Sequence, residues 1–413
     1  MDIAEAFKVM GTSVLFSGGS TDDLIKEVQA RPEFAAGGSK LLSVAQGLEG
    51  GIHLRAIDAV HELSYATRPL YGDDVFDLYV QWGLLRYLGL FDIQPKGASY
   101  PALQMSDAGC RIAGNQRRLT SEEMGIGFGV HLSRRWFKQA GVGAAISVTD
   151  VDVALRSGVG FGAGTRRRVR QVADKRPDYL LVVSDAGSPM SYRIRALECK
   201  GTSSPSYATA QLARAAEQLN GLTVGGRIPT GLAVSTITGN NEVSYLAIDP
   251  SDEEDPSYEV NSTTVQRSRT FDLAGRGRNV PASELASATV SGSWAMLADY
   301  AGNLEGLERW APNVMQSGLS RRQRDRPTIE TPFGPAIGTR INFEVQNRRL
   351  TVWYAVSKSI DVQLSQGSAE DLAESQIEFA RPLSTEPDAL TIGEEDAIFS
   401  ATPDGSIFAL VLE

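Results

Sequence analysis

The residues best suited to chemistry are two acids and a lysine near the middle of the chain. Asp178 follows Pro177 at the start of an apolar segment, and Glu198 and Lys200 lie near the end of the next one. Both segments read as β-strands, in which alternate residues share a face, so Glu198 and Lys200 project together and Cys199 projects the other way. A tight turn between the strands brings Asp178 beside Glu198. The spacing therefore predicts two carboxylates and one ammonium group in a small volume.

Two carboxylates this close repel each other, and neither ionises easily unless a cation lies between them. Oxygen ligands without histidine or thiolate favour Mg²⁺ or Mn²⁺. Asp178 and Glu198 are the expected side-chain ligands, with the backbone carbonyl of Cys199 as a further one. A bound divalent ion lowers the pKa of water and polarises a phosphoryl oxygen. Lys200 would orient the attacking water or stabilise charge on the phosphate. This set of groups is suited to phosphodiester hydrolysis.

Pro177-Asp178 followed by Glu198-Cys199-Lys200 on consecutive predicted strands resembles the signature of the PD-(D/E)xK, or restriction-endonuclease-like, nuclease superfamily. The resemblance implies an α/β fold with a restriction-endonuclease-like core, in which a mixed sheet is flanked by helices. It makes Asp178 and Glu198 metal ligands and Lys200 the catalytic lysine. It further implies a Mg²⁺-dependent endonuclease that cleaves DNA, in a bacterial restriction or anti-phage defence setting.

The resemblance spans residues 120–250 and places a further metal-site carboxylate on the preceding helix. We predict that this helix starts at a capping box formed by Thr120, Ser121, Glu122 and Glu123. Glu123 is the expected auxiliary catalytic carboxylate. Glu122 is an alternative for that role, and capping alone would explain Glu123 without catalysis.

The helices on either side of the two strands carry further expectations. In the preceding helix, Gly125, Gly127 and Gly129 would let a neighbouring element approach closely. In the following helix, Gln211 and Gln218 stand where many family members carry a glutamine. The resemblance gives that residue a contact to the metal ligands or to phosphate, and an ordinary surface position is the alternative.

The chain divides into three expected domains. Residues 1–118 read as a mostly helical region that ends in a short β-wing and a helix, which resemble the end of a winged helix-turn-helix module. A helical bundle used for packing or dimerisation is the alternative. Residues 119–328 form the nuclease-like α/β unit. Residues 329–413 form an acidic, β-rich domain with hairpins across residues 346–347 and 403–405.

The periodicity of hydrophobic residues predicts the strands and helices within these domains. Strands are predicted over residues 144–155, 178–185, 192–200, 231–238 and 242–250. Helices are predicted over residues 21–30, 56–67, 73–91, 120–141, 207–222 and 291–311.

The net charge of −10 is unevenly distributed along the chain. Residues 361–413 carry twelve acidic side chains and one basic side chain, whereas residues 134–176 carry ten basic and three acidic ones. The basic stretch predicts contact with a polyanion, for which DNA is the expected partner, and a solvated loop is the alternative. The acidic domain would mimic nucleic acid or bind a protein partner.

Composition excludes several other classes of protein. Two cysteines, Cys110 and Cys199, with no CxxC pair, exclude a disulfide scaffold and a Cys-rich zinc module. Cys199 is expected to be a buried small hydrophobic residue rather than a nucleophile, because no histidine lies near it in sequence. The glycine-rich run at 158–165 lacks the pattern of a nucleotide-binding P-loop. The sequence shows neither a secretory signal nor a membrane span, so we expect a cytoplasmic protein without a membrane partner.

Two other functions stay open. A non-cleaving nucleic-acid-binding or scaffold subunit would use the same fold, although it would not need all three of Asp178, Glu198 and Lys200. A nuclease acting on RNA is the other, since only the winged-helix-like segment favours duplex DNA. Cleavage of a duplex usually needs two active sites, so a homodimer is also expected.

Overall fold

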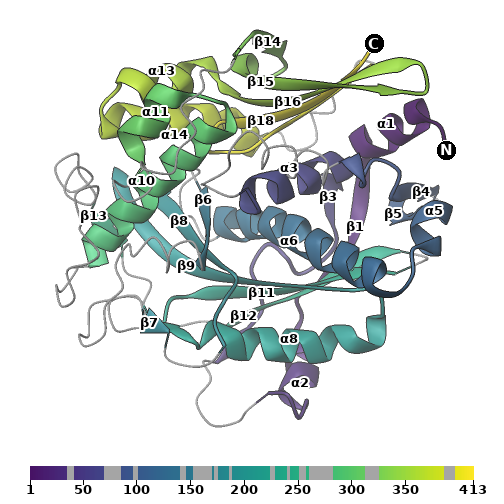
Figure 1. The fold of residues 1–413 in the computed structure, drawn as a ribbon. Helices are drawn as coiled ribbons and strands as arrows, with labels where there is room; N and C mark the ends of the chain where they lie inside the picture. The colour runs from purple at the N-terminus through teal and green to yellow at the C-terminus, as the bar shows by residue number, and fades with distance from the viewer. Residues whose placement is uncertain are drawn as a thin grey trace.

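The computed structural model shows a mixed α/β protein with one large mixed sheet flanked by helices and one separate antiparallel sheet (Figure 1). This confirms the predicted class at the level of a mixed sheet covered by helices. The structure describes residues 1–34, 41–68, 85–95, 101–139, 146–151, 170–171, 175–185, 188–223, 228–239, 242–250, 257–259, 282–311, 325–385 and 396–413.

The large sheet takes strands from both the N-terminal and the middle part of the chain. Its strand order is β4-β5-β1-β12-β11-β9-β8-β6, and β2, β3 and β13 pair with β12, β1 and β9. The strands are β1 Ser13–Gly19, β2 Leu42–Ser43, β3 Ile52–Arg55, β4 Phe91–Pro95, β5 Pro101–Met105, β6 Ile146–Asp150, β8 Tyr179–Asp185, β9 Ser188–Thr202, β11 Gly231–Thr238, β12 Val243–Pro250 and β13 Ser257–Glu259. The five strands predicted in the middle of the chain are confirmed as β6, β8, β9, β11 and β12. For the first of them, predicted over 144–155, the structure shows strand at 146–150, and residues 144–145 and 152–155 lie outside the described residues.

Residues 1–118 contribute strands as well as helices. The helices are α1 Ile3–Gly11, α2 Asp22–Gln29, α3 Ala56–Ala66 and α5 Asp107–Arg111. Strand β1 was not predicted; it buries Val14 and Phe16 and pairs in parallel with β12, so this region is built into the large sheet. The short extended segments are confirmed as the antiparallel pair β4–β5, and β5 also pairs with β1. Of the helix predicted over 73–91, the part before residue 85 lies outside the described residues. Its end is wrong, because residues 86–90 form a turn and β4 starts at Phe91.

Helix α6, Gly114–Gln139, starts earlier than predicted. Ser121 therefore lies inside the helix, where its hydroxyl donates to the Arg117 carbonyl (3.0 Å), and the predicted capping box is wrong. The predicted domain boundary after residue 118 falls within this helix, and the boundary after residue 328 falls within β14, Thr328–Thr331. Both boundaries stay predictions.

Glycines fix how closely α6 packs on the sheet, as the sequence predicted. A Cβ atom at Gly125 would lie 2.8 Å from the Lys200 carbonyl carbon, and one at Gly129 would lie 2.5 Å from the Cys199 sulfur. A Cβ at Gly127 would lie 2.3 Å from a carbonyl oxygen of α3. Helix α8, Pro205–Leu219, also packs on the sheet, on the opposite side from α6 in Figure 1. Strands β7 Arg170–Gln171 and β10 Leu222–Thr223 pair with each other in a separate two-stranded sheet.

The second sheet is fully antiparallel, in the order β14-β15-β16-β18-β17. Both predicted hairpins are confirmed, and Gln346 and Asn347 have the positive φ values (51° and 62°) that a two-residue hairpin turn needs. Helices α13 and α14 were not predicted. The elements of this part are α10 Ala282–Tyr300, α11 Leu304–Trp310, β15 Gly334–Val345, β16 Arg348–Ser357, α13 Lys358–Gln366, α14 Ala369–Thr385, β17 Ala397–Ala401 and β18 Ser406–Leu412.

Buried polar contacts join the second sheet to α3. His61 is fully buried, and its ring nitrogens lie 3.0 Å from the Ser400 hydroxyl and 3.2 Å from the Ser406 hydroxyl. Ser400 also donates to Asp58 (2.8 Å). Burial, with help from the nearby Arg134, lowers the pKa of His61 to about 3, so the ring is neutral at physiological pH.

None of the helices in the described ranges is both long enough and apolar enough to cross a membrane.

Candidate active site

The β8–β9 hairpin interlocks Asp178 and Glu198. Tyr179 pairs with Leu197 in the antiparallel ladder, which puts Asp178, one residue before β8, opposite Glu198. The Asp178 backbone N–H donates to Glu198 Oε2 (2.9 Å), and the Cys199 backbone N–H donates to Asp178 Oδ2 (3.0 Å). The hairpin thus brings the two predicted carboxylates together.

Lys200 completes the cluster on the same face of β9. Its ammonium group donates to Glu198 Oε1 in an ion pair. The side chain of Glu198 is 0% exposed, whereas that of Lys200 keeps 24% of its surface exposed. The Lys200 ammonium group is therefore accessible to solvent, next to the buried carboxylate of Glu198 and the half-buried Asp178.

Neighbouring elements hold the backbone around Asp178. Its carbonyl accepts a hydrogen bond from the Val151 N–H (2.9 Å), immediately after β6. Gln218 of α8 donates to the Arg176 carbonyl (3.3 Å), so this glutamine supports the segment that carries Asp178. Gln211, two helical turns earlier, donates to the Gly201 carbonyl beyond Lys200 (3.5 Å). Both glutamines contact backbone next to the cluster.

Full ionisation of both carboxyl groups, Asp178 and Glu198, is unfavourable at this site. Burial raises the pKa of Glu198 to about 8, and the charge of Asp178 adds to the rise while Lys200 opposes it. Burial also raises the pKa of Asp178. Burial alone would lower the pKa of Lys200, but Glu198 and Asp178 outweigh it and raise that pKa. Near neutral pH the cluster therefore retains a proton that an added cation would displace.

The donor set fits a hard divalent cation. Within the described ranges no three His, Cys, Asp or Glu side chains are grouped to hold a metal ion. Asp178 and Glu198 supply two carboxylates, and the Cys199 carbonyl belongs to the residue whose N–H already contacts Asp178. Mg²⁺ is commonly held by one or two carboxylates and completes its shell with water and substrate oxygens. These three groups match that requirement.

Asp150 is a nearby carboxylate that was not predicted for the site. It ends β6, pairs with Tyr179 in the ladder, and its charge contributes to the raised pKa of Asp178. The available signal was an acid at the end of a predicted strand. That signal is weak because it says nothing about which strand lies alongside.

Glu123 is not brought to the cluster. Its carboxylate binds the Tyr87 hydroxyl and the Arg86 guanidinium instead. Gly125 is the residue of α6 that faces Lys200, and a residue two positions earlier is turned about 200° around the helix axis. Glu123 therefore points away from β9. The alternative, Glu122, is largely exposed and lies 3.8 Å from an arginine of its own helix.

The Cys199 thiol lies on the other side of β9 from Glu198 and Lys200. It packs against Gly129 of α6, and its side chain is buried. Burial raises its pKa well above the ordinary value. The predicted burial of Cys199 is confirmed.

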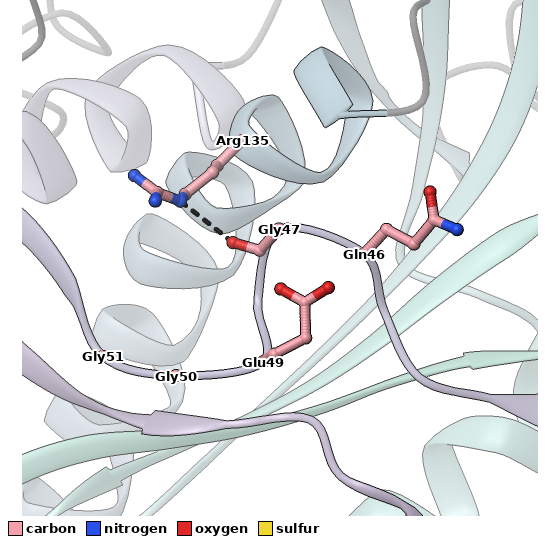
Figure 2. A pocket seen from close by; sticks show the side chains of 6 residues that line it. All are labelled: Gln46, Gly47, Glu49, Gly50, Gly51 and Arg135. Carbon is pink, nitrogen blue, oxygen red and sulfur yellow. Dashed lines mark hydrogen bonds between the residues drawn. The ribbon is translucent and has the colours of Figure 1, made fainter.

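Two arginines of the predicted basic stretch make contacts within the protein. Arg134 forms a buried ion pair with Glu62 of α3. Arg135 donates to the Gly47 carbonyl (2.9 Å) at the rim of a pocket, as Figure 2 shows. The pocket has a volume of about 360 Å³ and is lined by Gln46, Gly47, Glu49, Gly50, Gly51 and Arg135. Residues 152–169 of the stretch, with four of its arginines, lie outside the described residues.

In comparisons with known proteins, no family model, no curated protein and no solved structure matches this chain.

Proposed function

We propose that this protein is a metal-dependent endonuclease of the PD-(D/E)xK type that hydrolyses phosphodiester bonds in DNA. The observation that carries the proposal is the interlocked pair of Asp178 and Glu198 with Lys200 at its exposed side. Here a fully buried Glu198 lies against a half-buried Asp178. Ordinary surface ion pairs avoid such an arrangement, because each carboxylate repels the charge of the other. A buried arrangement of this kind is common where perturbed groups do chemistry.

The elements around the cluster are consistent with the restriction-endonuclease-like core that we propose. Strands β8 and β9 form the antiparallel hairpin that carries the motif. Helix α8 follows and returns the chain to β11, which pairs in parallel with β9. This is the strand–turn–strand–helix frame that the resemblance implies.

Each residue has a distinct proposed task. Asp178, Glu198 and the Cys199 carbonyl would hold Mg²⁺ or Mn²⁺, which supplies Lewis acidity and a more acidic bound water. Lys200, with its exposed ammonium group, would stabilise negative charge that develops on the phosphate. Gln218 would keep the segment before Asp178 in place through its bond to Arg176. We do not assign a catalytic role to Glu123, whose contacts lie elsewhere.

A cleavage assay tests the proposal. Supercoiled plasmid and single-stranded RNA would be incubated separately with the protein in Mg²⁺, Mn²⁺ or EDTA. We expect nicking or linearisation of the plasmid with either metal and none in EDTA. Asp178→Asn and Lys200→Gln should each lower the rate by about 100-fold or more.

Glu123→Gln is the matched control, since it removes a carboxylate that the structure keeps away from the cluster. It should retain cleavage. Cleavage that survives both Asp178→Asn and Lys200→Gln would contradict the assigned site. Cleavage of RNA but not of plasmid would identify RNA as the substrate. Binding of DNA without cleavage in any metal would favour the scaffold function.

A further inference from the structure

The second sheet has a long strand edge with no described neighbour. β14 pairs with β15 only as far as Ile337, and just beyond it the Gly338 N–H donates to the Pro327 carbonyl (3.3 Å). From Thr339 to Val345, β15 has β16 on one side, and no other strand of the described ranges lies on its other side. In Figure 1, β15 runs along the upper part of this sheet. Such an edge is a template for pairing with another strand.

The backbone groups that face this edge can be assigned. The Gly338 N–H points outward, since it bonds to Pro327 on the outer side. Backbone direction alternates along a strand, so Arg340, Asn342 and Glu344 also point their N–H and C=O groups outward. Val345 points inward and closes the two-residue hairpin, which agrees with this assignment.

The side chains at the edge are arranged symmetrically about Asn342. Arg340, Asn342 and Glu344 are exposed on one face, whereas Ile341 and Phe343 are half-buried on the other. A positive charge lies two residues before Asn342 and a negative charge two residues after it. Such a segment is complementary to itself when a second copy runs in the opposite direction.

We propose that a second copy of this chain pairs with β15 in antiparallel orientation, with Asn342 on the twofold axis. In this register Arg340 of each copy faces Glu344 of the other, and Ile341 faces Phe343. Each outward-pointing residue lies opposite another outward-pointing residue, so each such pair exchanges two backbone hydrogen bonds. The two five-stranded sheets then become one continuous sheet. This inference goes beyond the proposed function and does not depend on it.

The charges select this register over its neighbours. A pairing centred on Arg340 would place two arginines opposite each other, and one centred on Glu344 would place two glutamates opposite each other. Like charges directly opposed in a sheet are destabilising. Of these three registers, only the one centred on Asn342 gives both arginines a glutamate.

The ring of Trp353 on β16 restricts the side chain of Arg340, one of the two charged residues of the proposed contact. The Arg340 guanidinium lies over that ring, with 5.4 Å from its carbon to the ring centroid. Stacking holds the arginine against the sheet face, which lowers the entropy lost when it meets a partner carboxylate. A single strand edge buries less than the roughly 1,200 Å² of a standard interface, so we expect a weak dimer with a Kd on the order of micromolar.

Sedimentation velocity of the full chain over a range of concentrations tests the proposal. The wild type should shift from monomer to dimer as its concentration rises. Arg340→Glu and Glu344→Arg, each alone, should weaken association by about 10-fold or more, because each places like charges together at both contacts. An equimolar mixture of the two variants should associate again, since the acidic edge of one then faces the basic edge of the other.

Two further variants sharpen the outcome. The double variant R340E/E344R restores complementarity within one chain and should dimerise more strongly than either single variant. Lys358→Glu, an exposed charge reversal at the start of α13 and outside the pairing segment, is the matched control and should also dimerise. Circular dichroism would confirm that all variants are folded. A wild type that stays monomeric, a dimer that persists in both single variants, or a mixture that fails to associate would each overturn the proposal.

Discussion

At the scale of single residues, the proposed chemistry depends on how much charge the Asp178–Glu198 pair can hold. The folded-state pKa of Glu198 is raised to about 8 from an ordinary value of 4.5. The folded protein therefore keeps a proton that the unfolded chain releases between these two values. It follows that this carboxyl lowers the stability of the metal-free protein as pH rises from about 4.5 to about 8.

Glu198→Gln should remove the loss of stability that the metal-free protein suffers as pH rises. Without divalent cations, the free energy of unfolding of the wild type should fall between about pH 5 and pH 8, by up to a few kcal/mol. The glutamine variant should show a flatter profile, because its side chain carries no proton to lose. Chemical denaturation in EDTA at several pH values measures both.

Glu122→Gln is the control for loss of one negative charge, since Glu122 is exposed and lies outside the cluster. Its pH profile should match that of the wild type. A Glu198→Gln profile that also matches the wild type would contradict the charge balance described for the site.

The carboxylate pair was predictable from sequence because the information is local. Asp178, Glu198 and Lys200 lie on two strands joined by a short turn, and the strand period fixes which side chains share a face. Glu123 was not predictable in this way. Its direction depends on the phase of α6, and that phase is set where Gly125 meets the backbone of β9, a contact between distant segments.

At the scale of elements, the contact between α6 and β9 positions the cluster. Gly125→Ala would put a methyl group 2.8 Å from the Lys200 backbone, where nothing flexible can yield. We expect a loss of stability of about 1–3 kcal/mol, although alanine favours a helix over glycine by nearly 1 kcal/mol. Thermal or chemical denaturation measures it.

Gly292→Ala is the matched control. Gly292 also lies within a helix, α10, but a Cβ atom added there would meet no atom of the described residues within 4 Å. This substitution should stabilise the protein by about 0.5–1 kcal/mol. Equal effects of the two substitutions would mean that α6 does not press on β9 as described.

Sequence periodicity identified most strands of the large sheet but missed the short strands β2, β3 and β13 and also β1. That strand is short and lies between two helices, and its place in the sheet depends on pairing with β12, more than two hundred residues later. Helices α13 and α14 were missed for a similar reason. They lie between β16 and β17, and the two hairpins on either side led to an all-β interpretation of this part of the sequence.

At the scale of the whole molecule, the second sheet should unfold together with the rest. His61 of α3 lies between Ser400 and Ser406 with no exposed surface, so separating the sheet would leave buried polar groups without partners. We expect amides of β16 and β18 to exchange hydrogen at the same free energy as amides of β9.

His61→Ala should break this coupling. The loss of its two contacts should cost about 1–3 kcal/mol and let the second sheet exchange at lower free energy than β9. Hydrogen exchange followed by mass spectrometry distinguishes the two parts. Two separate transitions already present in the wild type would contradict the coupling.

The central proposal is that Asp178 and Glu198 would hold one divalent cation between them. Calorimetric titration of Mn²⁺ into the full chain, in buffers with different ionisation enthalpies, tests it most directly. We predict one bound ion per chain, release of close to one proton near neutral pH because the pKa of Glu198 is about 8, and loss of binding in Asp178→Asn. Absence of binding, or binding that Asp178→Asn leaves unchanged, would contradict the account.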